Sequence, residues 1–205
     1  MPGDKIFDLT GSHNSTNLIG KFLIASPFIG LSDIFNKSII YIIDHNPKGA
    51  VGLIINHQIY TNNKSKVKGS RTFFSNVNGN YEPIKPEIRI FLGGPIDTDK
   101  GFIIHSNEYK HDLLTEPASD VYISCSPDTL NKILEGGGPK QSLLMMGYTG
   151  WEAGQLEKEI AENLWIVAEG DTALIFDVHN EDKWDNTLKK MGIDQSLFSC
   201  RVGHG

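Results

Sequence analysis

The stretch that most constrains the fold runs from Ser142 to Gly170, SLLMMGYTGWEAGQLEKEIAENLWIVAEG. It opens with the apolar run Leu143–Met146, whose length and composition are typical of a strand buried on both faces. Gly147 ends this run, and Thr149–Glu152 then fits a capping box with Thr149 as the N-cap residue. The stretch therefore predicts a core strand, a tight turn and a helix.

Apolar residues recur at helical spacing after the turn and predict one buried stripe on an amphipathic helix. They are Ala153, Leu156, Ile160 and Leu164. The first N–H groups of such a helix lack internal partners and lie at the positive end of the helix dipole, which favours anion binding. Gly150 would let a ligand approach the backbone closely. The alternative is a structural turn in which Trp151 and Leu156 anchor the core.

Short apolar runs separated by turn residues predict further strands on both sides of this stretch. They are expected at residues 21–26, 38–45, 50–56, 88–92, 101–106, 121–125 and 172–176. Asn46–Gly49 (NPKG) fits a type I turn, which predicts a hairpin between the second and third runs. The short connection after Leu92 favours a second hairpin, between 88–92 and 101–106. The run 172–176 is expected to pair with 165–168.

Two more helices are predicted from their end signals. Ser126-Pro127 is a typical helix start, and the helix ends at the glycines that begin with Gly136. With runs 121–125 and 142–146 it makes a parallel βαβ unit, expected to be right-handed. Asn180 is expected to cap a helix over 181–191. Hairpins come first and βα units later, so the predicted fold class is α+β with a mixed sheet.

Length and composition predict one main domain. A chain of 205 residues supports one sizeable core or at most two small ones. Residues 1–17 form a polar lead without periodic signal, and residues 18–205 are expected to form a single domain. Within it, residues 58–86 form a polar excursion that either is partly mobile or contains a short helix.

Charge and hydrophobicity exclude several classes of protein. The net charge of −6 and the lack of a helix-turn-helix pattern argue against direct DNA binding. No apolar run approaches the roughly 20 residues of a membrane span, and the N-terminus lacks the pattern of a signal peptide. Cys125 and Cys200 show no CxxC pattern, so two reduced thiols and a cytoplasmic location are expected.

Known catalytic and cofactor motifs are absent. The segment 136–142, GGGPKQS, lacks the spacing of a phosphate loop and lies between a helix and a strand. There is no dinucleotide fingerprint, no nucleophile elbow and no HExxH pair. No catalytic residue, metal ligand or cofactor is therefore assigned, although an enzyme of unknown reaction stays an alternative.

The best candidate for a ligand site combines glycine turns at strand ends with nearby polar side chains, as in many small-molecule pockets. The candidate residues are Gly93, Gly94, Thr149, Gly150, Trp151, Gln155, His45, Asn56 and His105. These residues must lie together in the folded chain if the pocket exists.

Three sequence blocks resemble the bacterial YqgE/AlgH family. They are FNKSIIYIIDHNPKGAVGLIIN (35–56), FLGGPIDTDKGFIIH (91–105) and GYTGWEAGQLEKEIAENLW (147–165). Asp177, Trp184 and the terminal Gly203-His204 also fit, and the resemblance extends from about Leu18 onward. The chain departs from the family pattern at residues 61–81 and at His57, where an Arg commonly stands.

The resemblance implies an α+β fold whose branched sheet curls into a pseudo-barrel. It also implies a transcriptional regulator, although no reaction is attached to this family. Because direct DNA binding is disfavoured by charge, regulation is expected to act through a protein or small-ligand partner. The alternatives are a small-molecule or phosphate-binding domain and a structural assembly partner.

Overall fold

The computed structural model describes residues 17–27, 32, 34–59, 74–77, 80–83, 88–114 and 120–193, with only the backbone at 74–77 and 80–83. The strands are β1 (Phe22–Ala25), β2 (Ile39–Asn46), β3 (Gly49–Ile54), β4 (Phe74–Val77), β5 (Asn80–Pro83), β6 (Ile90–Leu92), β7 (Ile96–Ser106), β8 (Val121–Ser124), β9 (Ser142–Glu152) and β10 (Trp165–Ala168). The helices are α1 (Pro127–Leu134), α2 (Gln155–Ala161), α3 (Thr172–Phe176) and α4 (Asn180–Lys190). Residues 1–16, Cys200 and Gly203-His204 lie outside the described part.

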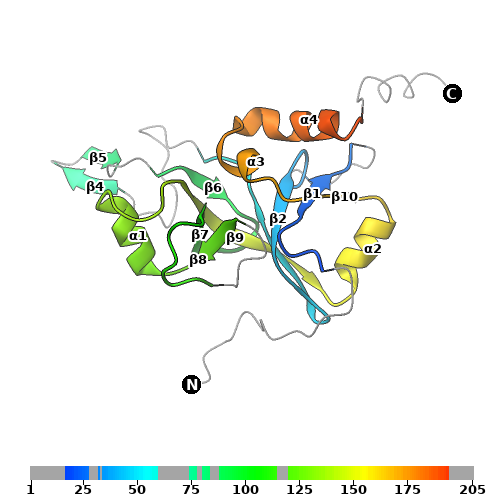
Figure 1. Cartoon of the computed structure of the whole chain (residues 1–205), viewed down its shortest axis with the longest axis horizontal. Helices are drawn as coiled ribbons and strands as arrows, with labels where there is room; N and C mark the ends of the chain where they lie inside the picture. Colours follow the sequence, from blue (N-terminus) through cyan, green and yellow to red (C-terminus); the bar gives the residue numbers. More distant parts are fainter. Residues whose placement is uncertain are drawn as a thin grey trace.

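The main sheet is mixed and contains eight of the described strands. Its hydrogen-bonded order is β10-β1-β2-β3-β9-β7-β8, with β6 also paired to β9 (Figure 1). The predicted β2–β3 hairpin is confirmed, with Asn46 opposite Gly49. The order does not close into a barrel, and the pseudo-barrel curl stays a prediction.

The branch point of the sheet is β9. Over residues 144–146, β6 pairs with one edge of β9 in parallel and β7 with the other edge in antiparallel orientation. Further along, Thr149–Glu152 pair with β3. The predicted hairpin between 88–92 and 101–106 is therefore wrong, because β9 lies between β6 and β7.

The predicted βαβ unit is present in a split form. Both β8 and β9 run antiparallel to β7, which lies between them, so β8 and β9 are parallel to each other. Helix α1 connects them and starts as predicted, with Ser126 Oγ accepting the N–H of Asp128 and a proline in the first turn. The handedness of the crossover stays a prediction.

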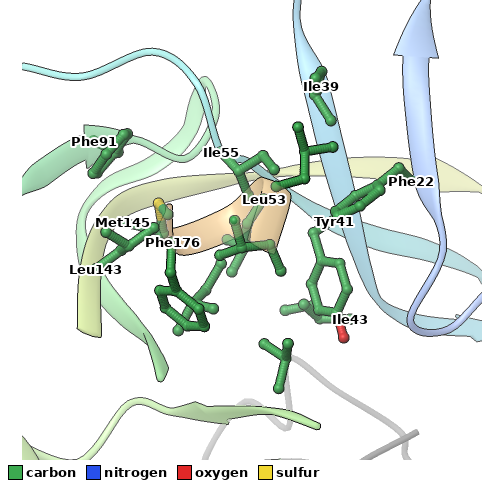
Figure 2. Packing of buried hydrophobic residues seen from close by; sticks show 14 of the residues in the cluster. Phe22, Ile39, Tyr41, Ile43, Leu53, Ile55, Phe91, Leu143, Met145 and Phe176 are labelled. Carbon is green, nitrogen blue, oxygen red and sulfur yellow. The ribbon is translucent and has the colours of Figure 1, made fainter. Parts of the chain in front are cut away.

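Side chains alternate between the two faces of the sheet along each strand, and apolar clusters cover both faces. Phe22, Tyr41 and Met145 pack on one face with residues of α3 and α4, and Figure 2 shows Phe176 of α3 among them. On the other face, one cluster holds Trp151 and Trp165 beneath α2, and a smaller one lies beneath α1. Leu143 and Leu144 face opposite sides, as expected for a strand buried on both faces.

Two predicted elements are corrected by the structure. Residues 172–176 form helix α3 instead of a strand, because the Asp171 side chain accepts the N–H groups of Ala173 and Leu174 and so caps a helix. Helix α4 is present, but its N-cap residue is His179 rather than Asn180. Within the polar excursion, β4 and β5 form a two-stranded sheet, and the choice between a mobile segment and a short helix stays a prediction.

These elements confirm the α+β class with a mixed, branched sheet and flanking helices. Helix α4 lies over β1 and β2 together with α3, while α2 and α1 lie near opposite ends of the sheet (Figure 1). A pocket lies where α3 and α4 meet the β1–β10 pair.

Candidate functional site

The predicted helix start at Thr149 is wrong. Thr149 lies within β9, is 2% exposed, and donates its hydroxyl to the backbone oxygen of Gly52 at 2.9 Å. The alternation of buried Thr149 and Trp151 with exposed Gly150 and Glu152 is the period of a strand. The amides of this segment thus belong to a sheet, and the helix begins only after the end of β9, at Gln155.

Gly93 and Gly94 lie against the same part of β9, but backbone fills the space between them. A Cβ on Gly94 would lie 2.1 Å from the carbonyl atoms of Tyr148, and one on Gly93 would lie 2.3 Å from the oxygen of Gly147. The Gly93 N–H donates to Met146 O at 2.8 Å. These glycines permit a close approach of two chain segments, which explains their presence without a ligand.

Trp151 and Gln155 meet at a carboxylate that the sequence did not reveal. Glu159 Oε2 accepts the indole N–H of Trp151 and that of Trp165, each at 2.7 Å. Its Oε1 accepts the side-chain amide of Gln155 at 2.8 Å. The carboxylate of Glu159 thus joins α2 to β9 and β10.

His45 lies at the other side of α2. Its side chain is 4% exposed, and its Nε2 is 2.8 Å from Glu157 Oε1. Its Nδ1 accepts the N–H of Leu18 at 3.3 Å, which places the ring proton on Nε2, facing Glu157. His45 and Trp151 therefore contact α2, and Gln155 is its first residue. The side chain of each makes its hydrogen bond to another protein group.

Asn56 and His105 lie apart from these groups. Asn56 accepts the N–H of Ile39 and donates to Lys37 O, so it ties β3 to the chain before β2. His105 is fully buried in β7, donates Nδ1–H to Ser106 O, and leaves Nε2 without a partner among the described residues. Burial lowers the pKa of His105. The nine predicted residues thus include one group at the glycines and Thr149 and another around α2, with Asn56 and His105 outside both, and their role as ligand contacts stays a prediction.

A pocket of about 420 Å³ lies where α3 and α4 meet β1 and β10. Its apolar lining comes from Phe22, Ala168, Leu174, Val178 and Met191. Met191 is 39% exposed, which is high for a large hydrophobic residue of this chain. The volume falls in the range of small-molecule sites.

Charged and polar side chains also line the pocket. Glu169 pairs with Lys21, and Asp171 Oδ2 lies 3.3 Å from Lys190 Nζ. Asn186, Lys189 and Lys190 of α4 also line the pocket. These three are spaced by three and four residues, so they share one helix face. The lining of the pocket thus includes amide and ammonium groups beside its apolar side chains.

Sequence reasoning missed this pocket because its residues come from segments that were assigned differently. Leu174 belongs to the run 172–176, which the sequence predicts as a strand. A usable signal was the Asp171-Thr172 pair before an apolar run, since Asp is a preferred N-cap residue.

A buried lysine holds α4 against the rest of the fold. Lys183 is fully buried, and its Nζ donates to Ile175 O at 2.7 Å and to Ile55 O at 3.2 Å. Burial, and secondarily the charge of Arg89, lowers the pKa of Lys183 to about 7. Lys183 does not line the pocket, although Thr187, which does, donates its hydroxyl to Lys183 O.

The described residues form neither a recognisable metal site nor a membrane-spanning helix. They contain no group of three or more His, Cys, Asp or Glu side chains placed to hold a metal ion. Among the helices that the structure describes, none combines the length and apolar character needed to cross a membrane. Cys125 is exposed and free.

The observations define a class of protein: an α+β chain built on a branched mixed sheet, with a pocket beneath its last described helix. Comparison with known proteins identifies the family. The chain belongs to the AlgH-like family, whose model matches residues 22–196.

Bacterial relatives support this assignment over nearly the full length. A UPF0301 protein of Rickettsia massiliae is 39% identical over 203 residues, covering 98% of this chain and 99% of the relative. A UPF0301 protein of Rickettsia prowazekii is 38% identical over 201 residues, covering 98% of each.

Solved structures agree with the fold. The solution structure of the AlgH protein from Pseudomonas aeruginosa is similar with a TM-score of 0.70 and 32% identity, covering 96% of this chain and all of that one (100%). A crystal structure from Corynebacterium diphtheriae has a TM-score of 0.65 at 20% identity, covering 92% of this chain and 94% of that one, which supports the fold alone.

Proposed function

We propose that the chain is a binding protein that acts indirectly, through a small ligand or a protein partner that occupies the pocket between α3, α4 and the β1–β10 pair. The resemblance to YqgE/AlgH proteins implies a transcriptional regulator, and the net charge of −6 disfavours direct DNA binding. The observation that carries the proposal is the pocket itself. Its volume is about 420 Å³, and both apolar and polar side chains line it.

The contacts of the other candidate residues favour this location over the region around Thr149. Thr149, Gln155 and Asn56 use their polar side-chain atoms on protein partners. Met191, by contrast, exposes a large apolar side chain on the pocket, and exposed apolar surface is typical of binding sites.

A pocket-filling variant tests this function. A thermal-shift screen of metabolites and short peptides is expected to find a ligand that raises the melting temperature of the wild type, since binding to the folded state stabilises it. At a hundredfold excess over Kd, the rise should be about 5–10 °C for a chain of this size. Met191→Trp, which fills the pocket, should abolish the rise.

Ile96→Trp is the matched control, because Ile96 is another well-exposed large hydrophobic residue and lies outside the pocket. It should leave the rise unchanged. If no compound stabilises the wild type, or if Met191→Trp leaves the effect intact, the function does not reside in this pocket.

A second candidate function, an enzyme of unknown reaction, has one observation in its favour. The Nε2 atom of buried His105 has no hydrogen-bond partner within the described part of the chain, and a catalytic role is one explanation for an unpaired buried polar group. The pocket does not include His105, so binding is the better supported proposal.

A further inference from the structure

The chemical character of the pocket wall indicates what kind of ligand fits it, and this inference rests on the proposed function. Its charged groups do not contribute equally, because most of them are already neutralised by a neighbour. Glu169 pairs with Lys21, and Asp171 pairs with Lys190 while its other oxygen accepts the N–H of Ala173 at 3.0 Å.

Lys189 is the exception. It lines the pocket and is exposed, and its side chain makes no hydrogen bond or ion pair within the described part of the chain. Asn186, one turn earlier on the same face of α4, is likewise exposed, and its side-chain amide has no hydrogen-bond partner among the described residues. The pocket wall therefore presents one uncompensated ammonium group and one free amide.

The apolar part of the lining offers a ligand no hydrogen bonds from side chains. It includes Ala168, Leu174, Val178 and Met191. A ligand that matches both parts of the lining has an apolar body and a single anionic end. A second charge would lie on apolar surface, where its lost hydration is not replaced.

From this pairing of surfaces, we propose that the pocket binds an amphipathic monocarboxylate, with the apolar chain against Leu174 and Val178 and the carboxylate held by Lys189 and Asn186. Charge-assisted hydrogen bonds of this kind are stronger than neutral ones. The net charge of −6 does not oppose such binding, because exposed charges more than about 8 Å away are largely screened at physiological salt.

The position of Lys189 has a structural explanation as well, which the test must separate from ligand binding. Lys189 lies in the last turn of α4, where a cation stabilises the helix dipole. Lys190 lies in the same turn and contributes in the same way. The affinity for a ligand, rather than the stability of the protein, is therefore the quantity to measure.

The test uses the whole chain and octanoate as the probe, with affinities from amide chemical-shift titration. Octanoate is expected to shift resonances of α3, the end of α4 and β10. Lys189→Gln should weaken its binding about five- to tenfold, the effect of losing one charged hydrogen bond. Lys158→Gln is the control, since Lys158 is exposed on α2, outside the pocket, and it should leave the affinity unchanged.

Chain length and head group supply independent readouts. Affinity should rise about fourfold for each methylene group from butanoate to octanoate. Octanol should bind the wild type more weakly than octanoate does, and its affinity should be the same for the wild type and Lys189→Gln. The carboxylate assignment is overturned if octanoate does not bind, or if Lys189→Gln leaves the affinity for octanoate unchanged.

The same titrations separate the two proposals. Suppose that octanoate fails to bind, or that Lys189→Gln leaves its affinity unchanged, while octanol or octylammonium binds in the pocket and Met191→Trp abolishes that binding. The pocket is then a ligand site of different specificity, and only the carboxylate inference fails. If none of the three probes perturbs pocket resonances, the inference fails, and the thermal-shift screen then decides the proposed function independently.

Discussion

Lys183 illustrates how a single residue couples the fold to pH. Its ammonium group has no carboxylate partner among the described residues and is held by two backbone oxygens, Ile55 O and Ile175 O. Two hydrogen bonds do not replace full hydration of the charge, so burial favours the neutral amine. The consequence is that the folded chain releases this proton near pH 7.

We predict that Lys183 makes the stability of the chain rise with pH above neutrality. The pKa of Lys183 is about 7 in the folded chain against 10.5 for the ordinary group. Between these values the unfolded chain binds more protons than the folded chain, so the free energy of unfolding increases with pH. Relative to Lys183→Met, the wild type should gain up to about 1.4 kcal/mol per pH unit.

Urea unfolding at pH 7.5, 8.5 and 9.5 measures this difference. Comparing the slopes makes the test independent of the cost of leaving Ile55 O and Ile175 O without a donor. Lys158→Met, which removes an exposed lysine, should follow the wild type at every pH. Parallel curves for the wild type and Lys183→Met would contradict the prediction.

At the scale of elements, the sequence was sufficient where the signal was local. Ser126-Pro127 specifies the start of α1, and the apolar run Leu143–Met146 specifies a strand buried on both faces. The Asn46–Gly49 turn specifies the β2–β3 hairpin. In each case neighbouring residues provide the hydrogen bonds or the apolar faces that determine the element.

The sequence was insufficient where a distant partner decides between two local possibilities. Thr149–Glu152 fits a capping box, but pairing with β3 and the hydroxyl contact to Gly52 O hold it in β9. The pocket was missed for a related reason: its walls come from β1, β10, α3 and α4, and no local pattern reveals that these elements meet.

The close approach of β9 to the Gly93-Gly94 segment gives a prediction for Gly94→Ala. A Cβ there would lie 2.1 Å from Tyr148 C and O, which are backbone atoms and cannot rotate away. The free energy of unfolding should fall by about 3 kcal/mol or more, as for severe overpacking. Urea unfolding and the yield of folded protein measure the effect.

Gly137→Ala is the matched control for this prediction. Gly137 has an ordinary φ, and the nearest atom to a Cβ there is Lys132 O at 3.5 Å. It should change the free energy of unfolding by less than about 0.5 kcal/mol. A Gly94→Ala protein as stable as this control would mean that the two segments are not closely packed.

At the scale of the whole molecule, charge predicts how the chain meets nucleic acid. A net charge of −6 gives little attraction for a phosphate backbone. In a gel-shift titration we expect no complex with duplex DNA at about 150 mM salt, and the loss of any complex formed at lower salt. A complex that persists at near-physiological salt would show that the chain binds DNA directly and would contradict the indirect action proposed above.

The branching at β9 has a consequence for how the chain is made. β3, β6 and β7 can complete their pairing only after residues 142–152 have been synthesised. β1 pairs with residues 165–168, which are synthesised later still. Ribosomes add about 5–20 residues per second, so the earlier strands spend several seconds without these neighbours while the nascent polypeptide is still tethered. Chaperones that shield unpaired strands during synthesis therefore have a defined interval in which to act on this chain, and it ends only when β9 and β10 emerge from the exit tunnel.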